Sequence, residues 1–177
     1  MNLFATNFCP TSSAADMPDK LCVKMILETA QLLSTAHYEI DGATEVEGTP
    51  LYKPTHRNHP CAVWVRATAD NYMWAFDHFV ALCQEYTRRY GKRHATETKL
   101  RTALRLTPAG LAWTGLTPPP ACMPDEYKVE APGTWPTSSY RKYLSQGKAY
   151  TADAAKAWAK AGGAPYWVED YQNSLQS

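Results

Sequence analysis

Hydrophobic side chains recur every three or four residues between Asp19 and His37, the longest helix-periodic stretch of the chain. Such spacing puts apolar positions on one face of a helix. The apolar positions are Val23, Ile26, Leu27, Ala30, Leu33, and Ser34 or His37. A polar stripe with the same spacing, typical of a solvated face, comprises Lys20, Lys24, Glu28, Gln31 and Thr35. The pattern predicts a helix over 19–37, with Pro18 suited to its first turn.

A second helix-periodic segment runs from about Asp70 to Tyr90. Its stripe of large side chains comprises Tyr72, Phe76, Phe79, Cys83, Tyr86 and Tyr90. We expect this stripe to be a core face centred on Phe76, Phe79 and Cys83. Gly91 is a helix stop, and the basic residues near it suit the negative end of the helix dipole. A third, shorter helix is predicted to begin at Thr96, with Leu100, Ala103 and Leu104 facing inward.

The segments between these helices lack a long period. Residues 41–50 are predicted to be a loop, and residues 51–66 an ordered loop that enters the apolar run Ala62–Val65. Residues 107–139 hold seven prolines, and we expect them to wrap the surface. The expected anchors of this segment are Leu111, Trp113, Met123 and Trp135.

The two ends of the chain are predicted to dock on the rest. An N-terminal arm would use Leu3, Phe4 and Phe8. A short helix follows Pro136–Thr137, and a last helix, capped by Thr151, runs from Ala152 to about Ala161. The C-terminal tail would dock through Tyr166, Trp167 and Tyr171. With no series of strands in view, the predicted fold class is mainly α, a single compact helical domain over residues 1–177 with long Pro-rich surface loops.

Composition restricts the kinds of partner, cross-link and cellular compartment that can be expected for the protein. The net charge of the 177 residues is +1, so global charge indicates no partner. The five cysteines contain no C-x-x-C pair, which argues against a disulfide framework and a zinc cluster. We find neither an apolar run of membrane-spanning length nor a signal peptide, so a reduced, cytosolic protein that does not contact a membrane is expected. The oligomeric state stays open.

Charge is uneven along the chain. The segment from Arg88 to Arg105 holds seven Lys or Arg residues and one acid, Glu97. Such an excess favours a surface that contacts phosphates, with Arg89, Lys92 and Arg93 among its candidates. The alternative is a helix C-terminus followed by a solvated helix.

Two histidines, His56 and His59, lie three residues apart beside Lys53 and Arg57. We interpret them as hydrogen-bonding or phosphate-contacting groups, because no further metal ligands are apparent near them. No metal and no cofactor are therefore predicted.

Glu28 is the candidate functional carboxylate. It lies at the edge of the apolar face of the first long helix, one turn after Lys24. A carboxylate in that position can be held ionised in a partly dry site. Arg66, Asn71 and Tyr86 are candidates to orient it or a bound ligand. The alternative is a surface ion pair between Lys24 and Glu28.

Two resemblances add to these patterns. The segments 19–37, 51–66, 71–94, 117–128 and 139–144 resemble a family of small, mostly uncharacterised proteins encoded by tailed bacteriophages. The resemblance extends from the first helix to about Tyr143 and implies a protein of the host cytoplasm.

The order Asp19 then Glu28 on one helix, and the aromatic–basic segment Tyr140–Tyr143, are similar to the phage pyrimidine-dimer DNA glycosylase of the endonuclease V type. This resemblance implies that Glu28 stabilises charge developing on a sugar and that a free N-terminal amine attacks C1′. Leu27 replaces the family's arginine before the glutamate, and Leu21 replaces its histidine after the aspartate. Met1–Asn2 replaces a small N-terminal residue, and we expect Met1 to be retained because Asn2 is bulky.

Three hypotheses follow for the function. The first is a phage-encoded helical protein that binds DNA and could act on its N-glycosidic bonds. The second is a nucleotide-binding protein that sequesters or cleaves a small nucleotide. The third is a structural or interaction protein without a site. The sequence holds no Gly-rich phosphate loop, G-x-S-x-G elbow, H-E-x-x-H motif or zinc-deaminase signature, which excludes the enzyme classes with those motifs.

Overall fold

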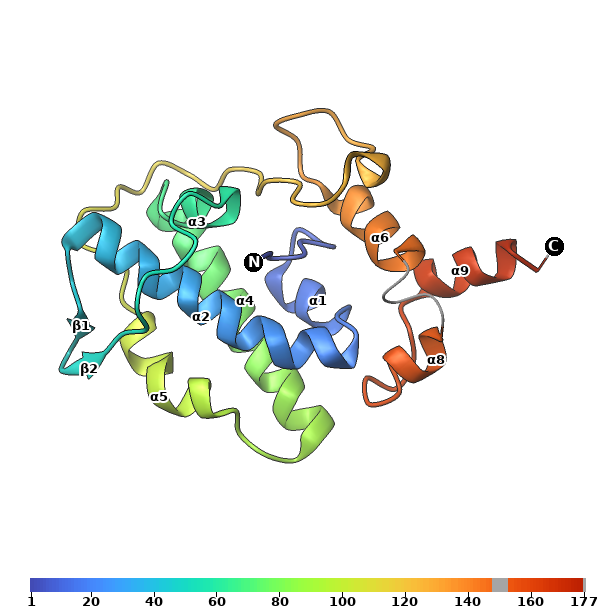
Figure 1. Ribbon diagram of the computed structural model, residues 1–177, viewed down its shortest axis with the longest axis horizontal. Coiled ribbons are helices and arrows are strands. Elements are labelled where there is room, and N and C mark those ends of the chain that lie inside the picture. The colour runs from blue at the N-terminus through green and yellow to red at the C-terminus, as the bar shows by residue number, and fades with distance from the viewer. Residues whose placement is uncertain (148–152, 177) are drawn as a thin grey trace.

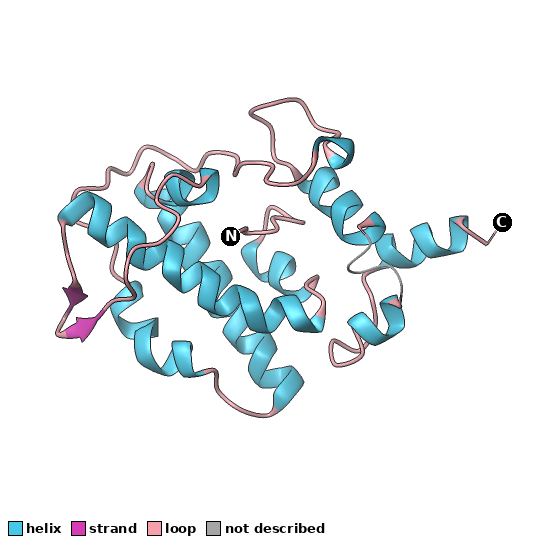
Figure 2. Cartoon of the chain, in the orientation of Figure 1, coloured by secondary structure: helices cyan, strands magenta, loops and turns pink. Residues whose placement is uncertain are grey.

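The computed structural model describes residues 1–147 and 153–176 (Figure 1). The helices in chain order are α1 (Pro10–Ala15), α2 (Asp19–Asp41), α3 (Pro60–Val65), α4 (Ala69–Tyr90), α5 (Ala95–Leu104), α6 (Thr137–Gln146), α8 (Ala154–Ala157) and α9 (Tyr166–Ser174), with a 3-10 turn, η1, at Asp125–Tyr127. Among the described residues the only strands are β1 (Glu45–Val46) and β2 (Thr49–Pro50), an antiparallel hairpin (Figure 2). The predicted mainly α fold class is confirmed. No helix in the described part of the chain combines the length and apolarity that a membrane crossing requires.

The helix predicted from the longest periodic stretch is α2, which packs across α4 in the centre of the molecule (Figure 1). It extends past the predicted end to Asp41, where Gly42 at φ +65° terminates it in the left-handed conformation that glycine favours. The prediction that Leu27 lies on the buried face is wrong, because its side chain is 41% exposed. Leu32 and Thr35 are buried instead, because α3, α4 and α5 together cover more than one side of α2.

The second predicted helix is α4, with boundaries within one residue of those expected. Thr68 caps its start by accepting a hydrogen bond from the backbone N–H of Asn71, and Gly91 at φ +67° ends it. Phe79 and Cys83 are fully buried, as predicted for the centre of the stripe. Phe76, predicted with them, is only partly buried. The third predicted helix is α5, and Leu100, Ala103 and Leu104 are buried in it as expected.

Two short helices, α1 and α3, were not predicted, and α3 lies in the segment that was expected to be an ordered loop. Each begins with a proline in its first turn, where the missing N–H of proline has no helical partner to lose. Six residues are too few to show a helical period, so the pattern missed both. His59 caps α3, because its Nδ1 accepts a hydrogen bond from the backbone N–H of Cys61.

The Pro-rich segment, residues 106–136, runs over α3 and the start of α4 to reach α6 (Figure 1). Thr117 fastens it, because the indole N–H of Trp64 and the side-chain amide of Asn71 both donate to Thr117. Met123 is buried and anchors the segment as predicted, whereas Trp113 is 66% exposed and does not. Two hydrogen bonds hold the chain near Trp113 instead, from Ala69 N–H to the carbonyl of Ala112 and from Gly115 N–H to the carboxylate of Asp70.

The C-terminal part packs around Trp158, which is fully buried and donates its indole N–H to the carbonyl of Asp16. With Ala154 and Val168 it forms a second, smaller hydrophobic cluster. The predicted cap Thr151 and the predicted start Ala152 lie outside the described residues. The described helix there is the short α8, capped by Asp153, and the expected docked tail is the helix α9.

Candidate active site at the N-terminal amine

The N-terminal arm, residues 2–6, is buried against the rest of the protein. Its fixed point is the side chain of Asn2. The amide nitrogen Nδ2 donates to the carbonyl of Cys122 at 2.7 Å, and Oδ1 accepts from the hydroxyl of Tyr140 at 2.6 Å and from the N–H of Leu3 at 2.8 Å. Phe4 adopts φ +48°, an uncommon conformation for a residue with a Cβ, and bends the arm. These contacts determine where the residue before Asn2 lies.

The α-amine of Met1 meets Glu28 on α2. The nitrogen lies 3.4 Å from Oε2 of Glu28, and Nζ of Lys24 lies 3.2 Å from Oε1. The Glu28 side chain is 14% exposed and that of Met1 is 3% exposed. The carboxylate therefore has a cation on each oxygen in a site largely shielded from water. The expected pairing of Lys24 with Glu28 is present, and the amine is the partner that helical spacing could not reveal.

This pair of groups has a clear chemical capacity. An unprotonated amine is a nucleophile, and it forms covalent adducts with electrophilic carbon. A carboxylate fixed a few ångströms away can stabilise positive charge that develops on the carbon under attack. Both groups are held by packed structure, the amine by the arm and the carboxylate by a long helix.

His59 lies in the same region. The pKa of His59 is lowered, mainly by partial burial and further by the positive charges of the Met1 amine and His56, while Glu28 acts in the opposite direction. The lowered pKa favours the neutral imidazole. His56 is exposed at φ +48° in the loop before α3, where its Nδ1 lies 2.7 Å from the hydroxyl of Thr55.

Two cysteines complete this region. Cys61 is fully buried in the first turn of α3, and its thiol donates to Sγ of Cys122 at 3.5 Å. This hydrogen bond and burial raise the pKa of Cys61, and the same bond lowers that of Cys122. One nitrogen of His59 and the two sulfurs all lie within 4.8 Å of one another. The sequence pattern did not bring Cys61 into the group although it is two residues after His59, and Cys122 is far away along the chain.

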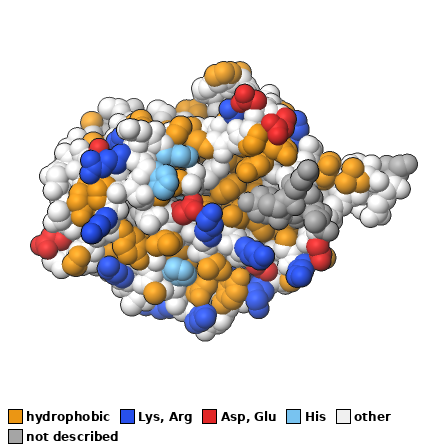
Figure 3. Space-filling view, in the orientation of Figure 1, with side chains coloured by type: hydrophobic (Ala, Val, Ile, Leu, Met, Phe, Trp, Pro, Cys, Tyr) orange, Lys and Arg blue, Asp and Glu red, His pale blue; other side chains and the backbone are white. Residues whose placement is uncertain are grey.

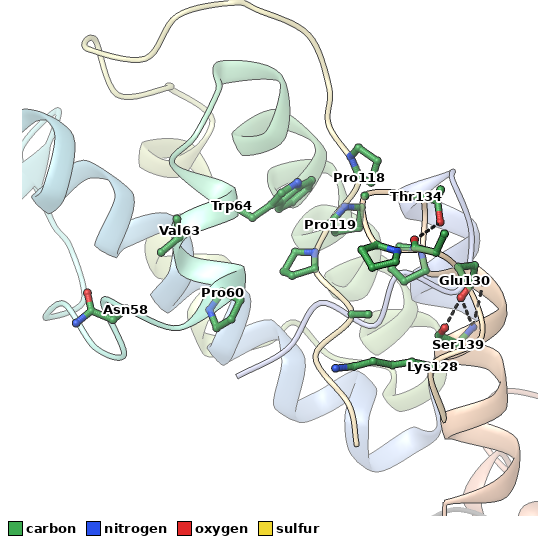
Figure 4. Close-up of a pocket in the computed structure, with 16 residues that line it drawn as sticks. Asn58, Pro60, Val63, Trp64, Pro118, Pro119, Lys128, Glu130, Thr134 and Ser139 are labelled. Atoms are coloured by element: carbon green, nitrogen blue, oxygen red, sulfur yellow. Dashed lines mark hydrogen bonds between the residues drawn. The ribbon is translucent and has the colours of Figure 1, made fainter. Parts of the chain in front are cut away.

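A hollow of about 710 Å³ adjoins these residues. Figure 4 shows Val63 and Trp64 of α3 on one side of it, Glu130 and Ser139 on the other, and Pro118 and Pro119 between them. Proline rings and the Trp64 indole make its wall rigid and mainly apolar. The hollow lies next to the two cysteines. Its lining includes Pro60 and Ala121, which directly precede Cys61 and Cys122 in the sequence.

Three other predicted site residues form contacts with other parts of the fold. Asn71 is fully buried, and its Oδ1 accepts from the backbone N–H of Thr117 at 2.9 Å. Tyr86 is buried and stacks on Tyr90 with ring centroids 4.9 Å apart. Arg66 is half-buried and donates to the carbonyl of Arg57 at 2.7 Å. Each of these contacts is with another part of the fold, and none of them is with Glu28.

The prediction that Arg89 lies on a phosphate-contacting surface is wrong. Its side chain is fully buried and pairs with Asp19 at 3.2 Å and Glu85 at 2.9 Å. It also donates to the carbonyl of Met17 at 2.6 Å. Part of the local excess of positive charge is therefore buried in ion pairs and does not lie on the surface.

Lys92 and Arg93 are on the surface. Both are exposed, and Arg93 lies 3.7 Å from Glu97. Lys and Arg side chains are numerous on this face near the end of α4 and α5 (Figure 3). We call the exposed set Lys92, Arg93, Lys99 and Arg105 the basic surface.

The geometry of an amine beside a helix glutamate agrees with a family relationship. A family model described as pyrimidine dimer DNA glycosylase matches residues 1–98, which include Met1, Glu28 and His59. No curated protein and no solved structure matches the chain significantly. Because the match covers more than half of the 177 residues, the chain belongs to the pyrimidine dimer DNA glycosylase family.

Proposed function

We propose that this protein is a DNA glycosylase that cleaves the N-glycosidic bond of a pyrimidine in a dimer lesion, with the Met1 amine as nucleophile and Glu28 as the stabilising carboxylate. The observation that carries the proposal is the 3.4 Å separation between that amine and Oε2 of Glu28. The family match supports the substrate class. The sequence resemblance to tailed-bacteriophage proteins further implies that the enzyme is phage-encoded and acts in the host cytoplasm.

The proposed step begins when the Met1 ammonium group, which pairs with Glu28, has released one proton to solvent and become an unprotonated amine. Its lone pair forms a bond to C1′ of the deoxyribose while the bond from C1′ to the base nitrogen breaks, and the base leaves with that electron pair. Positive charge builds on the sugar during this exchange, and the Glu28 carboxylate stabilises it. The nitrogen then loses one proton to solvent and its other proton to O4′ as the C1′–O4′ bond breaks, which opens the sugar ring and gives an imine between Met1 and C1′. Lys24, on the other oxygen, positions the carboxylate.

DNA would approach along the basic surface, where exposed cations can contact phosphates. The lesion must reach an amine that is held against α2, so a nucleotide has to leave the base stack. The hollow beside α3 has the volume and the apolar wall to hold such a nucleotide.

The test uses a duplex oligonucleotide with one pyrimidine dimer. Glu28→Gln keeps the shape of the side chain and removes its charge, so we expect a loss of about 100-fold or more in cleavage rate, with unfolding stability retained. Glu39→Gln is the matched control, because Glu39 is on the same helix and forms an ion pair with Arg57 at 3.1 Å. Cleavage by Glu28→Gln at the wild-type rate would refute the role of the carboxylate.

The amine is tested separately. Borohydride reduces an imine to a stable amine, so wild-type protein should become covalently joined to the lesion strand during the reaction. Mass spectrometry of the joined peptide should place the bond on the N-terminal residue and identify that residue as Met1. A joined peptide from any other part of the chain would exclude the Met1 amine as nucleophile.

The hollow favours one rival, a protein that binds a small nucleotide. Trp64 and the prolines could pack against a base, and Lys128 lies on the lining. Such binding would depend only mildly on salt, whereas affinity for duplex DNA falls steeply with salt. Titration with duplex DNA and with a panel of nucleotides at two salt concentrations separates the two functions.

A further inference from the structure

The proposed glycosylase step makes no use of the sulfur atoms of Cys61 and Cys122. These cysteines come from segments 61 residues apart, yet their sulfurs are 3.5 Å from each other. A ring nitrogen of His59 completes a group of three donors that all lie within 4.8 Å. Two thiol sulfurs and one imidazole nitrogen, grouped in this way, form a donor set that binds soft cations in proteins.

We propose that His59, Cys61 and Cys122 bind one Zn²⁺ ion, with the fourth coordination position open to water. Zinc binds thiolate sulfur at about 2.3 Å and imidazole nitrogen at about 2.0–2.1 Å in a tetrahedral arrangement. Those bond lengths separate neighbouring donors by roughly 3.4–3.8 Å. The observed distance of 3.5 Å between the sulfurs already has this spacing. Only a small closure of the imidazole toward the sulfurs is needed.

The three donors are held in place by the surrounding structure, as metal ligands commonly are. Cys61 is fully buried in the first turn of α3. The backbone N–H of Cys122 donates to the hydroxyl of Tyr140 at 3.2 Å, and its carbonyl accepts from Asn2. Nδ1 of His59 accepts from the N–H of Cys61 at 3.2 Å, which fixes the ring beside the sulfurs, and zinc bound at this nitrogen would replace that hydrogen bond.

Zinc at this position would link α3 to the Pro-rich segment. Cys122 belongs to that segment and also holds Asn2, the fixed point of the N-terminal arm. The ion would therefore stabilise the contact between the arm and the rest of the protein. This inference does not depend on the proposed glycosylase reaction, because it concerns binding and stability alone.

The experiment measures Zn²⁺ binding to the reduced, metal-free full chain by equilibrium dialysis and metal analysis. Keeping the protein reduced prevents oxidation of the thiol pair. We expect one Zn²⁺ per chain, and a higher unfolding temperature with Zn²⁺ than without it. Cys122→Ala should weaken binding by more than about 100-fold, since even outer-shell partners of a metal site contribute 10–100-fold. Cys9→Ala, which removes an exposed free thiol, should bind zinc as the wild type does.

A second measurement keeps the inference testable if Cys122→Ala does not fold. In wild-type protein, Zn²⁺ should slow alkylation of the half-buried Cys122 and leave alkylation of Cys9 unchanged. Cadmium should give the ultraviolet charge-transfer absorption of a metal–thiolate bond. Absence of stoichiometric zinc in folded, reduced wild type, or equal zinc affinity in Cys122→Ala, would overturn the proposal.

Discussion

The guanidinium of Arg89, near the end of α4, lies 3.2 Å from Oδ1 of Asp19, the first residue of α2. The other oxygen of Asp19 accepts the backbone N–H of Lys160 at 2.8 Å. One carboxylate therefore joins the two central helices and the C-terminal part of the chain. The buried cation is a structural element of the protein, which determines what its removal should do.

Arg89→Ala should lower the free energy of unfolding by about 3–5 kcal/mol, because it leaves the buried carboxylate of Asp19 without its cation, whereas Glu85 keeps its pair with Arg88. Urea denaturation measures this loss. The matched control is Arg88→Ala, whose side chain is 53% exposed, and whose loss should change stability by about 1 kcal/mol or less. Equal effects of the two variants would contradict the structural role of Arg89.

The basic surface should set the salt dependence of DNA binding. Lys92→Ala combined with Arg93→Ala should lower the slope of log affinity against log salt by about two units, since each phosphate contact contributes about one. Lys156→Ala, an exposed cation on α8, is the control and should leave the slope unchanged. A slope unaffected by the double substitution would remove this surface from the DNA contact.

Phe79 should matter more to stability than Phe76, although both belong to the same aromatic stripe. Phe79 is fully buried, so Phe79→Ala should cost about 3–5 kcal/mol through lost packing and the cavity it leaves. Phe76 is only partly buried, and Phe76→Ala should cost clearly less. Thermal and urea unfolding compare the two, and a reversed order would show that the core is centred elsewhere.

His78 should make the protein less stable as the pH falls below 6.5. Burial lowers the pKa of His78 from 6.5 to about 4, against the opposing effect of its hydrogen bond to the carbonyl of Pro10. The unfolded chain therefore binds more protons between these values, and stability that is complete above pH 6.5 is lost as the pH falls to 4. The full shift corresponds to about 3 kcal/mol.

Urea denaturation at pH 7.5 and at pH 5 measures this loss. His78→Gln should have a shallower pH dependence than the wild type, whatever its stability at pH 7.5. His56→Gln is the control, because His56 is exposed. An identical pH dependence in wild type and His78→Gln would show that His78 does not bind a proton on unfolding in this range.

Periodic patterns predicted α2, α4 and α5, because a helix of ten or more residues repeats its buried face often enough to be recognised. The short helices α1 and α3 have no such repeat. The predicted stripe missed the burial of Leu32 and Thr35 because several elements cover α2, and a single stripe describes a helix packed on one side only. Leu27, included in that stripe, is exposed. Tertiary contacts, which local patterns do not contain, decided these cases.

In the candidate site, too, some contacts followed from local sequence patterns and others did not. Lys24 and Glu28 are one turn apart, so their pairing followed from helical spacing. Glu28 has Met1 as its partner, and Cys61 has Cys122. Each partner lies far away along the chain, so no local sequence pattern indicates these contacts. Arg89 was placed on the surface by the sign of its neighbours in sequence, whereas its acidic partner Asp19 is 70 residues away.

The anchoring of Asn2 by Cys122 and Tyr140 has a consequence for biosynthesis. Asn2 is among the first residues to leave the ribosome, and its partners follow 120 and 138 residues later. During translation the arm must therefore wait unanchored, and the amine can settle beside Glu28 only after α6 has emerged. A fragment limited to residues 1–98, the part that matches the family, would lack both anchors of the arm that carries the amine.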